Sequence, residues 1–211
     1  MWSVLTDTLP EVIVVNGVQF GVETDFRVWI RAGQILNNAP DNPTTEASNR
    51  VIAELYDLIV KDDEEPDGFI PGADFITAVT EFYAGPQKPE QDDSDEDPRK
   101  PKPARTFDFE YDAGYVYQAF LQVYGLRLAT ASMHWWEFLT LFSGLMLTEG
   151  NSLNFVIGVR QKKLSDVPKG QRAAYGKMQK AFALPAKDGA DHARNDMIDR
   201  LTALWSESDG K

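Results

Sequence analysis

A charged, proline-rich segment divides this chain into two parts. Between Gly85 and Arg105 the only apolar side chain is Ala104, and five prolines interrupt the segment. Such a segment buries too little apolar surface to offset the entropy of ordering the chain, about 1–2 kcal/mol per residue. The sequence therefore predicts a small domain at 1–84, a disordered charged linker at 85–106 and a second domain at 107–211.

The first part begins with a hairpin pattern that is followed by three helical patterns. Two valine-rich runs flank Asn16-Gly17, a pair preferred in type I′ turns because both positions need positive φ. Thr24 or Asp25 then caps a helix, a second helix follows Pro43, and a third follows Pro71. Their apolar stripes are Phe26, Trp29, Ile30 and Gly33; Val51, Ile52, Leu55, Leu58 and Ile59; and Phe75, Ile76, Val79, Phe82 and Tyr83.

The second part shows only helical patterns. We expect Asp112 to cap the first helix and Gly125 to end it. Ser132 is expected to cap the next helix, which carries the small residues Ser143 and Gly144 for close packing. Further helical patterns cover about 153–163, a basic stretch at 169–182, and 191–206. Together the two parts predict an α+β fold that is mainly α, with an N-terminal hairpin and a C-terminal helical domain.

Composition excludes several classes of protein. The chain of 211 residues contains no cysteine, which excludes disulfides, thiolate nucleophiles and cysteine metal sites. No apolar run approaches the roughly 20 residues that a membrane span needs, and Met1 to Pro10 lacks the features of a secretory signal. We therefore expect a protein of the cytoplasm without membrane contact.

Charge is unevenly distributed along the chain. Of the net charge of −12, residues 1–84 carry −11, whereas residues 158–187 hold eight bases and one acid. The basic stretch suits phosphate contacts, but the acidic chain as a whole repels a polyanion, so nucleic-acid binding is disfavoured. The acidic and basic parts can attract each other within one chain or between chains, or both can be solvated faces.

The sequence offers little catalytic chemistry. Its two histidines, His134 and His192, stand far apart and without a carboxylate ligand pattern, and no glycine-rich phosphate loop is present. Asp108 and Asp112 are acids of a short alternating run, for which capping and an ion pair with Arg160 are simpler roles than paired catalytic carboxylates. We expect no enzymatic activity, no cofactor and no metal.

The run from Met133 to Phe138 contains two adjacent tryptophans. At about 100° of rotation per residue, Trp135 and Trp136 cannot both face one core, so one packs inward and the other finds another element or a partner. Tryptophan is also enriched where partners bind, because it combines large buried area with a polar N–H. The candidates for protein binding are Trp135, Trp136, Phe138, Tyr124 and Trp205.

Several of these residues belong to a pattern that resembles a known family. The pattern is Asp112-Ala113-Gly114-Tyr115-Val116-Tyr117-x-Ala119-Phe120, then Tyr124-Gly125-Leu126-Arg127-Leu128, then His134-Trp135-Trp136-x-Phe138, with Arg160 beyond. It resembles the gene-product-fifteen family of long-tailed phages over roughly residues 10–185. Arg127 departs from that pattern, in which an acid often stands at this position.

The resemblance implies a tail assembly chaperone. Such a protein binds the tape-measure protein, aids assembly of the tail tube and has no enzymatic role; the tail tube protein and a second copy of the chain are further expected partners. The alternative is a structural component of the virion, either in the tail or in the head–tail connector.

Overall fold

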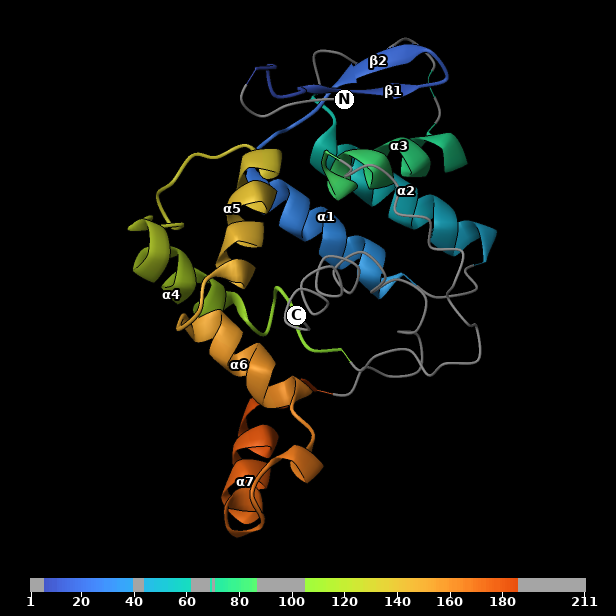
Figure 1. The fold of residues 1–211 in the computed structure, drawn as a ribbon. Coiled ribbons are helices and arrows are strands. Elements are labelled where there is room, and N and C mark those ends of the chain that lie inside the picture. Colours follow the sequence, from blue (N-terminus) through green and yellow to red (C-terminus); the bar gives the residue numbers. More distant parts are fainter. Residues whose placement is uncertain (1–5, 40–43, 62–68, 70, 87–104, 186–211) are drawn as a thin grey trace, which may run out of the picture. The chain divides into compact units, whose positions relative to one another are not determined.

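The fold is mainly helical with one small hairpin, as the sequence predicts (Figure 1). The computed structural model describes residues 6–39, 44–61, 69, 71–86 and 105–185. The chain forms two compact units, and each is described by itself. Unit 1 holds the described residues up to Pro86 together with Ser132–Thr140, and unit 2 holds 105–131 and 141–185.

The hairpin of unit 1 consists of strands β1 (Val12–Val15) and β2 (Val18–Gly21), paired antiparallel with Ile13 opposite Phe20. Its turn has positive φ at both Asn16 (51°) and Gly17 (81°), which confirms the predicted two-residue turn. Ile13 and Phe20 are buried, whereas Val12 and Val14 point to the opposite face and are exposed. One face of the hairpin therefore belongs to the core and the other meets solvent.

Three helices complete most of unit 1: α1 (Phe26–Asn38), α2 (Thr45–Ile59) and α3 (Ala73–Ala84). The carboxylate of Asp25 accepts the N–H of Arg27 and so caps α1, while the Thr44 hydroxyl caps α2. Of the two residues proposed as the α1 cap, Asp25 is therefore the correct one. The largest fully buried side chains here are Phe20, Trp29, Leu55, Ile59, Phe75 and Val79.

Unit 1 also contains the first part of helix α5 (Trp135–Leu147), because Ser132–Thr140 pack with it. The domain ranges expected from sequence stay a prediction, and residues 87–104 of the expected linker lie outside the described residues. The same holds for the acidic run at 62–65 and for the expected last helix at 191–206.

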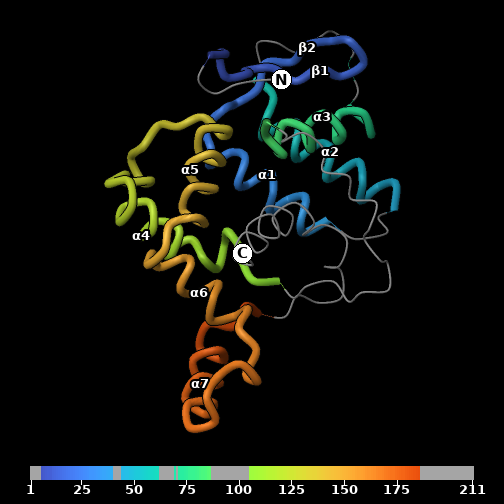
Figure 2. Tube along the Cα trace, viewed as in Figure 1, coloured from blue at the N-terminus to red at the C-terminus, as the bar shows by residue number. Residues whose placement is uncertain are grey.

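Unit 2 consists of α4 (Ala113–Tyr124), the remainder of α5, α6 (Ser152–Gln161) and α7 (Arg172–Phe182), whose path is traced in Figure 2. Two short 3₁₀ turns, η2 (Leu164–Asp166) and η3 (Lys169–Gln171), connect α6 to α7. Gly125 ends α4 in the left-handed conformation (φ 68°), as expected for a residue that closes a helix. The α7 helix lies beside α6 and has no fully buried residue.

A buried ion pair joins three parts of unit 2. The guanidinium of Arg160 binds both carboxylate oxygens of Asp112 at 2.7 Å, and it donates further hydrogen bonds to the carbonyls of Thr106 and Phe182. Asp112 is fully buried, so its charge depends on these contacts. The predicted pair with Arg160 is confirmed. Asp112 also precedes α4, but its carboxylate makes no capping hydrogen bond to that helix.

We expect Asp112→Ala to lower the free energy of unfolding by about 3–5 kcal/mol, because it leaves the Arg160 guanidinium buried without its counter-charge. Urea denaturation of the full chain measures this difference. Glu149→Ala, which removes an exposed acid of the same unit, is the control and should change the value by less than about 0.5 kcal/mol. Equal changes in the free energy of unfolding for the two variants would contradict the proposed contribution of the Asp112–Arg160 pair to stability.

We also expect opposite effects from two glycine substitutions within helices of unit 2. A Cβ at Gly144 in α5 would overlap the hydroxyl of Tyr124, whereas a Cβ at Gly158 in α6 would meet no atom within 4 Å. Gly144→Ala should therefore destabilise the protein by about 1–3 kcal/mol, and Gly158→Ala should stabilise it by up to about 1 kcal/mol. Thermal unfolding measures both.

The companion variant Tyr124→Phe/Gly144→Ala tests the cause of that loss. Phenylalanine lacks the hydroxyl that the new methyl group would meet, so the double variant should recover part of the stability lost in Gly144→Ala. If the stability of the double variant merely equals the sum of the two single effects, the overlap is not the cause of the loss.

Candidate protein-interaction site

The aromatic run around Trp135 begins with a histidine that caps helix α5. The imidazole Nδ1 of His134 accepts the backbone N–H of Trp136 (3.0 Å), and Nε2 lies 2.8 Å from the carbonyl oxygen of Pro10. Because Nδ1 accepts a hydrogen bond, the proton of the ring is on Nε2, which donates to Pro10. The expectation that Ser132 caps this helix is therefore wrong: His134 occupies the position directly before Trp135 and supplies the acceptor.

The two adjacent tryptophans bind the end of another helix. The indole N–H of Trp135 donates to the carbonyl of Tyr83 (2.9 Å), and that of Trp136 donates to the carbonyl of Phe82 (2.8 Å). These carbonyls belong to the last turn of α3, where the backbone carbonyls have no N–H donor within the helix. The second surface expected for one of the tryptophans is thus the C-terminal end of α3, which both side chains cap.

The same run is held against the start of α1. The backbone N–H of Trp135 donates to the carbonyl of Thr24 (2.8 Å), and the N–H of Phe26 donates to the carbonyl of Met133 (3.1 Å). The ring of Phe138 stacks on that of Phe26 with centroids 4.8 Å apart. The motif therefore joins α5 to both α1 and α3 within unit 1.

The structure separates the five candidate side chains. Trp135 and Phe138 are fully buried, so in this conformation neither offers surface to a partner. Trp136 is half-buried and packs beside the ring of Phe82, with part of its indole still accessible. Trp205 lies outside the described residues. Their roles in protein binding stay predictions, and Trp136 is the member of the aromatic run with exposed ring surface.

Tyr124 lies in unit 2 and fills a space between two helices. Its hydroxyl donates to the carbonyl of Leu141 (2.9 Å) and lies against Gly144, the small residue expected to allow close packing of α5. Burial raises the pKa of this hydroxyl above its ordinary value of 10.0. The contact explains why α5 carries a glycine in its interior despite the cost to helix stability.

Unit 2 exposes several large apolar side chains that the sequence patterns did not single out. Phe155 in α6 is 55% exposed and Leu147 at the end of α5 is 64% exposed. Phe155 lies on the side of α6 away from the buried Leu153 and Ile157 but one turn before the buried Val159, and its ring packs edge to face on that of Phe182, with centroids 6.0 Å apart. Sequence periodicity alone therefore does not mark it as exposed. Leu121, Leu164 and Tyr111 are exposed as well. Such side chains are the usual material of protein-binding surfaces.

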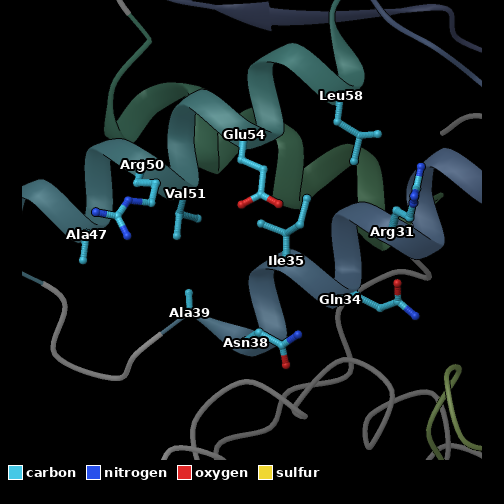
Figure 3. Close-up of a pocket in the computed structure, with 10 residues that line it drawn as sticks. All are labelled: Arg31, Gln34, Ile35, Asn38, Ala39, Ala47, Arg50, Val51, Glu54 and Leu58. Atoms are coloured by element: carbon cyan, nitrogen blue, oxygen red, sulfur yellow. The ribbon is translucent and has the colours of Figure 1, made fainter.

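A groove of about 700 Å³ lies between α1 and α2 in unit 1. Figure 3 shows Ile35 of α1 and Val51 and Leu58 of α2 directed into it, with Arg31, Arg50 and Glu54 among its other lining residues. The lining contains no cluster of groups suited to catalysis, and it is open to solvent. Within the described ranges, moreover, no group of three or more His, Asp and Glu side chains is arranged to hold a metal ion.

We expect the two tryptophans to differ in their contribution to stability. Trp135→Phe removes the indole donor to the Tyr83 carbonyl and leaves a cavity beside it, so it should lower the free energy of unfolding by about 2–4 kcal/mol. Trp136→Phe should lower the free energy of unfolding by about 1 kcal/mol. The loss is smaller because the Phe82 carbonyl, to which Trp136 donates, also accepts the N–H of Gly85. Urea denaturation with circular dichroism measures both losses, and a larger loss for Trp136→Phe would contradict this assignment.

No helix within the described ranges combines the length and apolar content needed to cross a bilayer. Comparison with curated proteins and with solved structures gave no match. The family model described as Bacteriophage Gp15 protein matches residues 5–184, which is most of the chain and contains the whole aromatic run. The chain therefore belongs to the bacteriophage Gp15 family and is a virion-related phage protein.

Proposed function

We propose that this protein is a tail assembly chaperone that binds the tape-measure protein and releases it as the tail tube forms. The observation that carries the proposal is the set of large apolar side chains that unit 2 exposes, above all Leu147 and Phe155. Its membership of a phage family supports a setting in the bacterial host cytoplasm during virion assembly.

The partner's chemistry fits these surfaces. A tape-measure protein is long and helical, and apolar stripes on such helices aggregate unless they are covered. Exposed leucine and phenylalanine side chains cover an apolar stripe through modest contacts, while Trp136 offers a further partly exposed ring in unit 1. Many weak contacts along a long partner give high overall avidity, yet each can be displaced by an incoming tube subunit.

The net charge of −12 supports the same role. Like charge on neighbouring chaperone molecules limits uncontrolled collapse and keeps the coated tape measure dispersed. The proposed mechanism requires no bond-making chemistry, because the protein acts only by binding and release.

A second candidate function is a structural component of the tail or of the head–tail connector. The virion-related character of the family favours it. The two functions differ in where the protein ends up. A structural component remains in purified particles at a fixed copy number, whereas a chaperone leaves the particle when the tube is complete.

Co-expression with the tape-measure protein tests the chaperone function. We expect the tape measure to enter the soluble fraction, and to co-elute in size exclusion, only when this chain is present. Absence of a complex, together with fixed-copy incorporation into mature particles measured by quantitative mass spectrometry, would instead establish the structural function.

The variant Leu147→Ser/Phe155→Ser tests the surface. Both side chains are exposed, so the fold should persist while the affinity for the tape measure falls about tenfold, a loss of ~1.4 kcal/mol. Gln161→Ser removes an exposed polar side chain of similar size from α6 and should leave binding unchanged. Equal binding by wild type and the double variant would exclude this surface without excluding the function.

A further inference from the structure

The two units carry opposite net charge. Among the described residues, unit 1 holds ten acids and four bases, a net of −6, whereas unit 2 holds five acids and nine bases, a net of +4. Most bases of unit 2 lie between Arg160 and Lys180, in α6, the 3₁₀ turns and α7. Opposite charge on two compact units of one chain provides complementary surfaces for a second copy.

The acidic unit presents an apolar sheet face to solvent. Val12 is 39% and Val14 is 54% exposed on the face of the hairpin that points away from the core. The two-residue alternation of β2 places Glu23 on the same face. Its carboxylate is exposed, and within the described parts of the chain it forms no ion pair. The first base of the chain is Arg27, beyond the hairpin.

The basic unit presents a helix face, on α7, whose alanines and lysines complement the apolar and acidic face of the hairpin. The Gln179 amide donates to the carbonyls of Val159 and Lys162, which fixes one side of α7 against the preceding segment. The opposite side of α7 consists of exposed residues: Ala173, Ala174, Lys177, Lys180 and Ala181. Neither lysine of this face has an ion-pair partner among the residues described. The face is flat, because alanine is its only other component.

We propose that the Val12–Val14 face of the hairpin in one copy of the protein docks on the outer face of α7 in a second copy. Val12 and Val14 pack over the alanines, and Glu23 meets Lys177 and Lys180. Each of these three charges is unpaired within the described residues of its own chain, so the contact satisfies charges without breaking existing ion pairs.

The contact joins two different surfaces, and each copy carries both of them. Such a heterologous contact repeats head to tail, and it produces a ring or an open string of molecules according to the rotation at each step. The inference rests on charge and burial in this chain alone and does not depend on the proposed function. For a chaperone it would supply the ordered coat that a long partner requires.

The test is the oligomeric state of the purified full-length protein in the absence of any partner, measured by analytical ultracentrifugation. We expect concentration-dependent association at about 50 mM salt that is largely lost at about 500 mM, because salt screens exposed charges. A monomer at every concentration and salt level would overturn the proposal, and it would point to attraction between the units within one chain.

Charge reversal identifies the two faces. Lys177→Glu/Lys180→Glu and Glu23→Lys should each be monomeric under conditions in which the wild type associates. An equimolar mixture of the two variants should associate again, because every contact between unlike variants pairs opposite charges. Misfolding of either variant cannot produce this rescue. No association in the mixture, with both variants folded by circular dichroism, would overturn the assignment of the faces.

Two further measurements complete the test. Arg127→Glu and Glu54→Lys reverse exposed charges elsewhere on units 2 and 1 and should leave association at the wild-type level. A fluorescent single-stranded oligonucleotide tests the other class of partner that a lysine face can bind. Lysine-dependent binding of that probe by a monomeric protein would overturn the proposal, whereas absence of binding supports it.

Discussion

The arrangement of unit 1 depends on the hydrogen bonds that two neighbouring indoles make with the end of α3. The last carbonyls of a helix lack intrahelical donors, and near the core they need partners from elsewhere. Trp135 and Trp136 supply those donors from the first turn of α5. His134 in turn satisfies an orphan N–H of α5 and binds the Pro10 carbonyl. A segment distant in sequence thereby becomes part of the N-terminal unit.

In unit 2 the Asp112–Arg160 pair has a comparable role. Its four hydrogen bonds join the residues before α4, the C-terminal half of α6 and the end of α7. Desolvation makes such a pair costly to form, and loss of either partner would leave a buried charge unpaired. The α7 helix has no buried residue of its own, and the carbonyl of Phe182 is one of the points at which it is held.

These anchors change how the aromatic motif is interpreted. An aromatic run with two tryptophans suggests a binding site, yet Trp135 and Phe138 are enclosed and bind their own chain. The exposed side chains that we propose as partner contacts are Phe155 and Leu147, those on the outer face of the hairpin and those on α7, in addition to the partly accessible Trp136.

The sequence by itself determined the local structure of this protein: the Asn16-Gly17 turn, the Asp25 and Thr44 caps, the end of α4 at Gly125 and the apolar stripes. Each depends on residues within about one helical turn, so short-range sterics and hydrogen bonding suffice. Tertiary structure alone decided that both tryptophans bind α3, that His134 binds the Pro10 carbonyl, and which valines and leucines remain exposed. These three hydrogen bonds join donors and acceptors more than 50 residues apart in the chain, and no local pattern encodes that pairing.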